Sequence, residues 1–258
     1  MLKAIDPHNK TFLTAQEAAE FLNLSLVTLK KLIYHGKIKT LKTPGGHHRI
    51  LKSELLSLLN SDLKESALNK HPAVGFFKSM VVIIEKKAPS QREHGSAVAT
   101  LSVNLAKKLR LPDKCVQGIR LAALFHDIGM IGISDSILNK AGALSVDEYS
   151  VVKNHSIAGG QIMSCAKDFG RLAVIIRQHH ERFDGKGYPD GLAQNEITQE
   201  ARIISVADAF AAMTTKNNYK DCIAQDRALD EIARNAGSQF DPLIADNFIR
   251  YLKGANEN

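Results

Sequence analysis

The sequence has few cysteines and no long hydrophobic run, and each shortage excludes a class of protein. The longest apolar runs, such as Met80 to Ile84, are far shorter than the roughly 20 residues that cross a membrane as a helix. No segment has the pattern of a cleavable signal peptide. The three scattered cysteines form neither a disulfide framework nor a thiolate zinc motif, and they fit a reducing compartment: Cys115, Cys165 and Cys222. We therefore expect a cytoplasmic protein with no membrane partner.

Acidic residues are scarce near the N-terminus, so the net charge of +7 is unevenly distributed over the 258 residues. Residues 1–60 hold nine lysine or arginine residues against four aspartate or glutamate residues, whereas the remainder is close to neutral. A small basic module joined to a larger, nearly neutral one suggests that the small module binds a polyanion. A solvated basic surface is the alternative.

The first 60 residues have the spacing of two short helices, a hairpin and a third helix. Thr14 and Glu17 are placed as a capping box, and an apolar stripe follows them. Ser25 can cap a second helix. The turn signal Pro44-Gly45-Gly46 lies between two strand-like segments, and a third helix is predicted from about Ser53 to Leu59. This order of elements is that of a winged helix-turn-helix.

Basic residues and histidines lie on the predicted second helix and hairpin. In a helix-turn-helix module the second helix enters the major groove, while basic residues around it contact phosphates. The candidate DNA contacts are therefore Lys30, Lys31, Lys39, His47, His48 and Arg49. Residues 13–19 (LTAQEAA) and 43–50 (TPGGHHRI) resemble the DNA-binding domain of excisionases and MerR-type regulators, and the resemblance implies DNA as a partner. A helical dimerisation module that never touches DNA is the alternative.

The predicted organisation is a winged helix-turn-helix domain at 1–60, a polar linker at 61–73 and a larger domain at 74–258. The linker is rich in Ser, Asp, Lys, Glu and Asn and ends near Pro72. The larger domain has helical spacing broken by Gly and Pro turns, without a long alternating strand pattern. Within it, Ser145 and Glu148 are placed as a second capping box, at the start of the helix expected to carry His155. We therefore predict a mainly α fold, with an all-helical bundle as its larger part. DNA binding on a repeated half-site would require a homodimer.

Histidines and aspartates recur between residues 94 and 208 at the ends or on the inner faces of predicted helices. Five helices can thus direct ligands at one centre, as helical bundles do in di-metal sites. A lone histidine on such a face is usually a core residue, but two adjacent pairs and three further residues make coincidence a poor explanation. The candidate metal ligands are His94, His126, Asp127, His155, His179, His180 and Asp208.

This set of ligands predicts a hydrolytic metal centre. Imidazoles and carboxylates without a thiolate favour iron or manganese over zinc. A carboxylate such as Asp127 can bridge two cations, which would lower the pKa of a water molecule and polarise a phosphoryl oxygen for in-line attack. We therefore expect metal-assisted hydrolysis of a phosphate ester, with His126 and Asp127 as catalytic residues.

The region from about residue 75 to residue 250 resembles the HD-GYP family. The motifs that carry the resemblance are His126-Asp127-Ile128-Gly129, His179-His180-Glu181, Asp184-Gly185-Lys186-Gly187-Tyr188-Pro189 and Phe240-Asp241-Pro242. The resemblance implies an all-helical domain with an iron or manganese centre of two or three ions. It also implies phosphodiesterase action that opens cyclic di-GMP to the linear dinucleotide, and sometimes to GMP. Ser90 stands where family members with a third metal usually carry glutamate, so we expect two metal ions.

Three positions depart from the HD-GYP pattern where substrate is expected to bind. Met130 replaces the lysine that ends the HD motif, Asn217 replaces an arginine two positions before Tyr219, and Ala211 replaces an aspartate. Each lost charge-assisted hydrogen bond costs roughly 1.5–3 kcal/mol, so two losses would slow catalysis by about two to four orders of magnitude. Four lysines could compensate: Lys140, Lys186, Lys216 and Lys220.

Two functions remain open at this point. The first is a working cyclic di-GMP phosphodiesterase whose DNA-binding module places or regulates it. The second is a DNA-binding transcriptional regulator that senses a cyclic dinucleotide through a catalytically weakened HD-GYP domain. The seven intact candidate ligands favour the enzyme. The expected substrate contacts are Lys186, Tyr188 and Lys220, and Tyr188 either stacks on a base or packs within its own loop.

Overall fold

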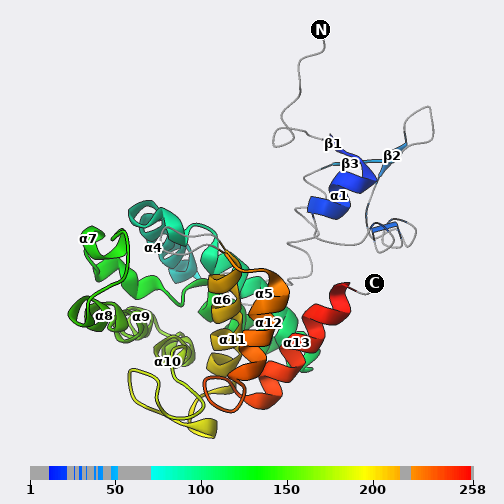
Figure 1. Cartoon of the computed structure of the whole chain (residues 1–258). Helices are drawn as coiled ribbons and strands as arrows, with labels where there is room; N and C mark the ends of the chain where they lie inside the picture. The colour runs from blue at the N-terminus through cyan, green and yellow to red at the C-terminus, as the bar shows by residue number, and fades with distance from the viewer. Residues whose placement is uncertain are drawn as a thin grey trace. The chain divides into compact units, whose positions relative to one another are not determined.

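The computed structural model describes residues 12–21, 26, 29–30, 33, 38, 40–42, 48–51, 71–215 and 222–256. The chain divides into two compact units, residues 1–65 and residues 66–257, and each is described by itself (Figure 1). The predicted mainly helical fold class is confirmed. The predicted domain limits at residues 60 and 74 stay a prediction. Within the described ranges, no helix combines the length and the apolarity needed to span a membrane.

The N-terminal unit begins its first helix, α1 (Ala15–Phe21), at the predicted capping box. The Thr14 backbone N–H donates to Glu17 Oε2 at 2.8 Å, and the Glu17 N–H donates to Thr14 Oγ1 at 3.2 Å. Part of the predicted second helix is described as well, because Leu26, Leu29, Lys30 and Ile33 are helical. Leu29 is fully buried, as the apolar stripe requires.

A three-stranded antiparallel sheet completes the described part of this unit. Strand β3 (His48–Leu51) lies between β1 (Phe12–Leu13) and β2 (Leu41–Lys42). Strands β2 and β3 are the predicted hairpin, whereas the two-residue β1 is too short to show an alternating pattern in the sequence. The predicted turn at 44–46 and the predicted third helix at 53–59 lie outside the described residues.

The C-terminal unit is a bundle of helices around one hydrophobic core. Figure 1 shows α5, α6 and α11 side by side, and α9 pairs with α10. The helices of this unit are α4 (Pro72–Lys87), α5 (His94–Lys108), α6 (Asp113–Leu124), α7 (Asp135–Leu138), α8 (Val146–Lys153), α9 (His155–Ser164), α10 (Gly170–Gln178), α11 (Gln199–Thr214), α12 (Gln225–Arg234) and α13 (Pro242–Asn256). Short 3-10 turns join some of them: η2 (Pro89–Gln91), η3 (Ile128–Gly132) and η4 (Gln194–Glu196).

One predicted helix is divided in two. The predicted capping box of Ser145 and Glu148 is present, but the helix that it begins, α8, ends at Lys153. His155 opens a separate helix, α9. The expectation that one helix runs from Ser145 through His155 was therefore wrong. Asn154 at the junction keeps helical angles, φ −66° and ψ −12°, and neither Gly nor Pro marks the break, so the sequence carries no sign of it.

Candidate metal centre

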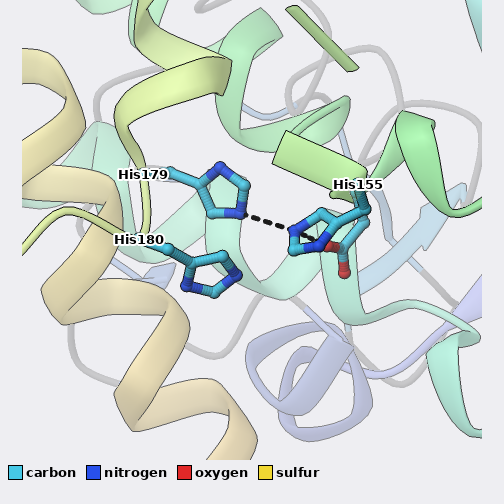
Figure 2. Close-up of side chains that lie close together, drawn as sticks. His155, His179 and His180 are labelled. Atoms are coloured by element: carbon cyan, nitrogen blue, oxygen red, sulfur yellow. Dashed lines mark hydrogen bonds and ion pairs between the residues drawn. The ribbon is translucent and has the colours of Figure 1, made fainter. Parts of the chain in front are cut away.

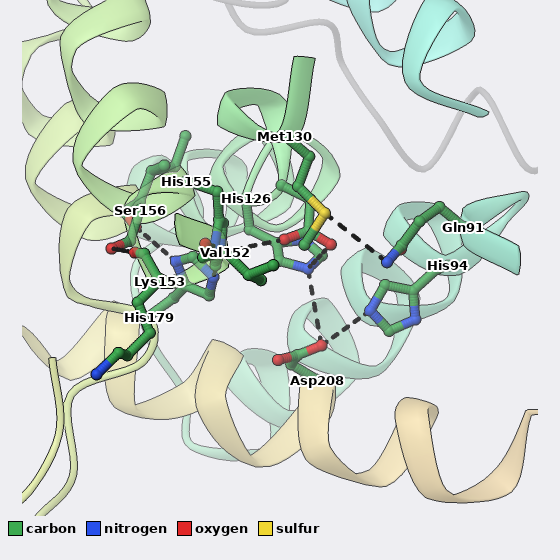
Figure 3. A network of polar contacts seen from close by, with 12 residues as sticks. Gln91, His94, His126, Met130, Val152, Lys153, His155, Ser156, His179 and Asp208 are labelled. Atoms are coloured by element: carbon green, nitrogen blue, oxygen red, sulfur yellow. Dashed lines mark hydrogen bonds and ion pairs between the residues drawn. The ribbon is translucent and has the colours of Figure 1, made fainter. Parts of the chain in front are cut away.

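Five segments of the bundle bring the seven predicted side chains together. Figure 3 shows His94, His126, His155, His179 and Asp208 of this set. His94 opens α5 and His155 opens α9, whereas Asp208 lies within α11. The two adjacent pairs follow helix ends: His126 and Asp127 come after α6, and His179 and His180 come after α10. Helix ends can bring short side chains from different directions to one point. The structure therefore brings the seven residues to one place, although His155 opens a helix of its own and does not continue α8.

The ligand atoms form two groups that share one carboxylate. Asp127, His155, His179 and His180 offer atoms that all lie within 4.8 Å of one another, and so do His94, His126 and Asp127. The two oxygens of Asp127 face different histidines, with Oδ2 3.2 Å from His126 Nε2 and Oδ1 3.3 Å from His155 Nε2. This is the placement expected of a carboxylate that bridges two cations.

Asp208 completes the group that contains His94 and His126. Its Oδ1 lies 2.9 Å from His94 Nε2 and 3.7 Å from His126 Nε2 (Figure 3). Both carboxylates of the cluster thus lie against imidazole nitrogens, and all seven residues are buried or half-buried.

Backbone carbonyls fix the orientation of three of the histidines. The Nδ1 atoms of His126, His155 and His179 lie 2.7, 2.7 and 2.5 Å from the carbonyl oxygens of Ala123, Val152 and Ile176. A carbonyl oxygen only accepts hydrogen bonds, so each Nδ1 carries a proton and donates it. In the neutral ring the Nε2 lone pair is then directed into the cluster, as in histidines that bind metals.

This tautomer leaves lone pairs that a cation would satisfy. His155 Nε2 and His179 Nε2 lie 3.2 Å apart, and both are acceptors in the neutral rings (Figure 2). His126 Nε2 is a buried nitrogen without an aligned hydrogen bond among the described residues. Facing lone pairs in a buried site repel each other and lack a donor. The donor set therefore fits bound divalent cations.

The histidines of the cluster differ in pKa and therefore in their protonation at neutral pH. Burial, followed by the neighbouring histidines, lowers the pKa of His179 well below its usual value, and burial lowers the pKa of His180 to about 4. Burial would lower the pKa of His126 as well, but the charges of Asp127 and Asp208 offset it and raise this pKa to about 9. His126 must therefore lose a proton at neutral pH before a cation can bind to it.

The two carboxylates remain ionised in spite of their burial. Burial alone would raise the pKa of Asp127, but His126, His155 and His94 hold it well below its usual value. Asp208 is similar, because its hydrogen bond with His94 and the nearby histidines outweigh the effect of burial and lower its pKa. Ionised carboxylates are the form that binds cations.

Gly129 allows α9 to approach the HD motif. A Cβ atom at this position would lie 2.0 Å from the His155 carbonyl oxygen and 2.6 Å from the Gly159 backbone nitrogen. Only a glycine can occupy such a contact. The glycine of the motif therefore brings His155 within reach of Asp127.

The loop after the histidine pair is held by Glu181, a residue with no role predicted from the sequence. Its carboxylate accepts hydrogen bonds from the backbone N–H groups of Asp190, Gly191 and Leu192 at 2.7, 3.1 and 3.1 Å. Gly187 is tightly packed as well, since a Cβ there would lie 2.3 Å from the Arg182 backbone nitrogen. The only sign of this role in the sequence is the position of Glu181, directly after two candidate ligands.

The predicted substrate contacts are only partly described. Tyr188 lies against a candidate ligand, with its ring centroid 4.9 Å from that of His180 and the planes 33° apart. Lys186 is exposed. Lys140, named as a compensating cation, is paired with Glu148 at 2.6 Å. Lys216, Asn217, Tyr219 and Lys220 lie outside the described residues.

Two of the three positions that depart from the HD-GYP pattern, Met130 and Ala211, are described, and both are apolar residues inside the fold. Met130 is buried, and its Sδ lies 3.9 Å from Gln91 Nε2, which donates to it (Figure 3). Ala211 packs within the hydrophobic core. Among the described residues, neither position is occupied by a charged group.

The candidate DNA contacts lie in the N-terminal unit, and three of them are described. Lys30 is exposed. His48 Nδ1 lies 2.6 Å from Thr40 Oγ1, and Arg49 Nη1 donates to the His48 carbonyl oxygen at 3.3 Å. Lys31, Lys39 and His47 lie outside the described residues. The predicted roles in DNA binding stay predictions.

Comparisons with known proteins match both units. A family model described as an HD domain matches residues 78–244, and one described as a helix-turn-helix domain matches residues 12–62. The chain is 41% identical over 148 residues to the cyclic di-GMP phosphodiesterase response regulator RpfG of Xanthomonas campestris, covering 57% of this chain and 39% of that protein. It is 36% identical over 160 residues to the 3'3'-cGAMP-specific phosphodiesterase 3 of Vibrio cholerae, covering 62% of this chain and 35% of that protein.

A solved structure shares the fold. Bd1817, an HDG"Y"P protein from Bdellovibrio bacteriovorus, aligns over 81% of this chain and 83% of its own length, with a TM-score of 0.53 and 21% identity. The chain spans less than half the length of the two phosphodiesterases that it matches.

Proposed function

This chain belongs to the HD domain family, and on that premise we propose that it is a metal-dependent phosphodiesterase that hydrolyses cyclic di-GMP. The observation that carries the proposal is Asp127, whose two oxygens face histidines of two different ligand groups. His94, His126 and Asp208 would hold one cation, and His155, His179 and His180 would hold the other. We propose two ions, iron or manganese, because the donors are imidazoles and carboxylates without a thiolate.

The residues of the cluster would prepare the site before substrate binds. Divalent cations bound there would supply Lewis-acid activation of water and of a phosphoryl oxygen. The carbonyls of Ala123, Val152 and Ile176 keep three Nε2 atoms directed at the cluster. Asp208 orients His94, and burial of His126, His155 and His179 excludes bulk water from their side of the site.

Cyclic di-GMP is the proposed substrate because of the relatives. The names of the matched proteins from X. campestris and V. cholerae specify cyclic di-GMP and 3'3'-cGAMP, which are both cyclic dinucleotides. Tyr188, beside His180, is the aromatic group proposed to stack on a base. Lys186 and Lys220 are proposed as further contacts.

Steady-state kinetics beside a binding titration test this proposal. The purified full-length protein, loaded with iron or manganese, is expected to convert cyclic di-GMP to the linear dinucleotide over many turnovers. Tight binding of cyclic di-GMP without turnover would reject the enzyme. The absence of both binding and turnover would reject cyclic di-GMP as the substrate.

A second candidate is a regulator that binds a cyclic dinucleotide and hydrolyses it slowly or not at all. The observation that favours it is the buried, uncharged Met130 beside the cluster, where the family pattern has a lysine. Retention of seven candidate ligands favours the enzyme over this alternative, since binding alone does not require a complete set.

The N-terminal unit is proposed to bind DNA as a homodimer. Its match to a helix-turn-helix domain and its excess of basic residues support this role. Binding through phosphates weakens steeply as salt rises. Mobility shifts with genomic fragments are expected at low salt and are expected to disappear as salt is raised. No shift at low salt would reject DNA as the partner.

A further inference from the structure

We infer that Lys153 binds the second phosphate of a cyclic dinucleotide and so sets the specificity of the site for substrates with two phosphates. The inference rests on the proposed function. Lys153 is the last residue of α8, two positions before His155, and it was not among the lysines considered from the sequence.

Aromatic contacts connect Lys153 to the candidate metal centre. Its ammonium lies 5.4 Å from the centroid of the Tyr149 ring and 5.9 Å from that of Tyr188. The Tyr188 ring in turn lies 4.9 Å from that of His180. The Tyr188 ring therefore lies between the Lys153 ammonium and the candidate ligand His180, which places Lys153 close to the cluster.

Within the described ranges of the chain, Lys153 has no acidic partner that would neutralise its charge. Among the residues that the structure describes, no carboxylate lies within 4.0 Å of its ammonium, whereas Lys140 is paired with Glu148 at 2.6 Å and Lys87 with Asp135 at 3.3 Å. Its side chain is half-buried. A partly desolvated ammonium that lies beside aromatic rings can still bind a strong anionic partner.

Lys153 is placed to bind a phosphate that lies outside the cluster, not the phosphate that lies at the cluster. Figure 3 shows its side chain extending from beside His155 in a direction away from Met130 and Asp208. It therefore does not take the place of the lysine that Met130 replaces. A cyclic dinucleotide carries two phosphodiester groups, and when one lies at the cluster the other carries a negative charge outside it. Lys153 is placed on the Tyr188 side to bind that charge.

The test compares substrates with one and two phosphates in the metal-loaded, full-length protein. We expect Lys153→Met to raise the KM for cyclic di-GMP about 10- to 100-fold, because a charge-assisted contact is lost, with a smaller change in kcat. For bis(4-nitrophenyl) phosphate, which has one phosphate, we expect kcat/KM to stay within about twofold. Lys153→Arg, which keeps the charge, is expected to restore the KM to within about threefold of wild type. Metal content is expected to be unchanged.

Lys108→Met is the matched control. Lys108 is exposed and lies 14 residues after His94 in α5, about 21 Å along the helix axis. If Lys153→Met impairs both substrates equally, the inference is overturned and Lys153 only positions Tyr149 and Tyr188. If it impairs neither substrate, the inference is overturned because Lys153 does not contact the substrate.

The same experiment separates this inference from the proposed function. A wild-type protein that binds cyclic di-GMP without turnover rejects the proposed enzymatic activity. The role of Lys153 is then decided by the Kd for cyclic di-GMP: a higher Kd in Lys153→Met supports the inference, and an equal Kd overturns it. A wild-type protein that neither binds nor hydrolyses cyclic di-GMP rejects both.

Discussion

The candidate metal centre keeps all the polar residues predicted as its ligands, whereas the surface where substrate is expected to bind has lost some of the polar residues of the HD-GYP pattern. All seven candidate ligands converge, and carbonyl groups orient three of the histidines. On the substrate side, Met130 is buried and uncharged, and Ala211 belongs to the core. The ligands are held by the backbone and by each other, so their geometry does not depend on the charged residues expected to bind substrate phosphate. A chain can therefore lose those charged residues while the cluster is kept.

Removing the shared carboxylate is expected to have the largest effect. Asp127→Asn takes one charge and one ligand oxygen from both groups, so we expect loss of bound metal and a fall in turnover of at least about 1000-fold, roughly 4 kcal/mol. Elemental analysis and initial rates measure the two effects. Asp246→Asn is the control, because Asp246 forms an exposed pair with Arg250 at 3.0 Å. Metal content equal to that of wild type in Asp127→Asn would contradict the shared role.

A methyl group at Gly129 is expected to separate the two ligand groups. In Gly129→Ala the new Cβ would meet the backbone of His155 and Gly159, so α9 must move and the protein loses about 1–3 kcal/mol of stability together with bound metal. Gly132→Ala is the matched control, because a Cβ at Gly132 has no heavy atom within 4 Å. Thermal unfolding and metal content are the measurements. Equal behaviour of the two variants would show that the close contact does not position His155.

Restoring the lysine of the HD motif tests whether the substrate side limits the rate. If Met130→Lys regains a charge-assisted hydrogen bond to phosphate, we expect kcat/KM for cyclic di-GMP to rise about 10- to 100-fold. Met130→Leu, which changes the side chain without adding charge, is expected to stay at the level of wild type. No gain in Met130→Lys, with normal metal content, would mean that another group already supplies this contact.

The smallest expected effect is a pH dependence of the metal-free protein. The pKa of His126 is raised to about 9, so its proton stabilises the fold fully below about pH 6.5, and this stabilisation is lost as pH rises toward 9. His180, with a pKa of about 4, is neutral throughout that window. Chemical unfolding of chelator-treated protein is expected to show the decline, and metal binding near pH 7.5 is expected to release about one proton. Unfolding free energy that is constant from pH 6.5 to 9 would contradict the raised pKa.

The sequence predicted the residues of the cluster better than the residues around it. His and Asp at the ends of apolar stripes carry their own signal, because a buried polar group needs a partner. Lys153 carried none, since the tyrosines that it contacts come from two different segments of the chain. The pairing of Lys140 with Glu148 was also invisible in the spacing, so a lysine that was expected to compensate for Met130 is engaged elsewhere.

Backbone details were predicted unevenly for the same reason. The capping boxes at Thr14 and Ser145 are local patterns of four residues, and both are present. The short strand β1 depends on pairing with the distant β3, and neither Gly nor Pro marks the break at Asn154, so local spacing could reveal neither feature.

Anomalous diffraction from crystals of the manganese-loaded protein tests the central claim most directly. We predict two strong peaks beside Asp127, one among His155, His179 and His180 and the other among His94, His126 and Asp208. Density for apolar packing or water alone at these nitrogens, without an anomalous peak, would contradict the account.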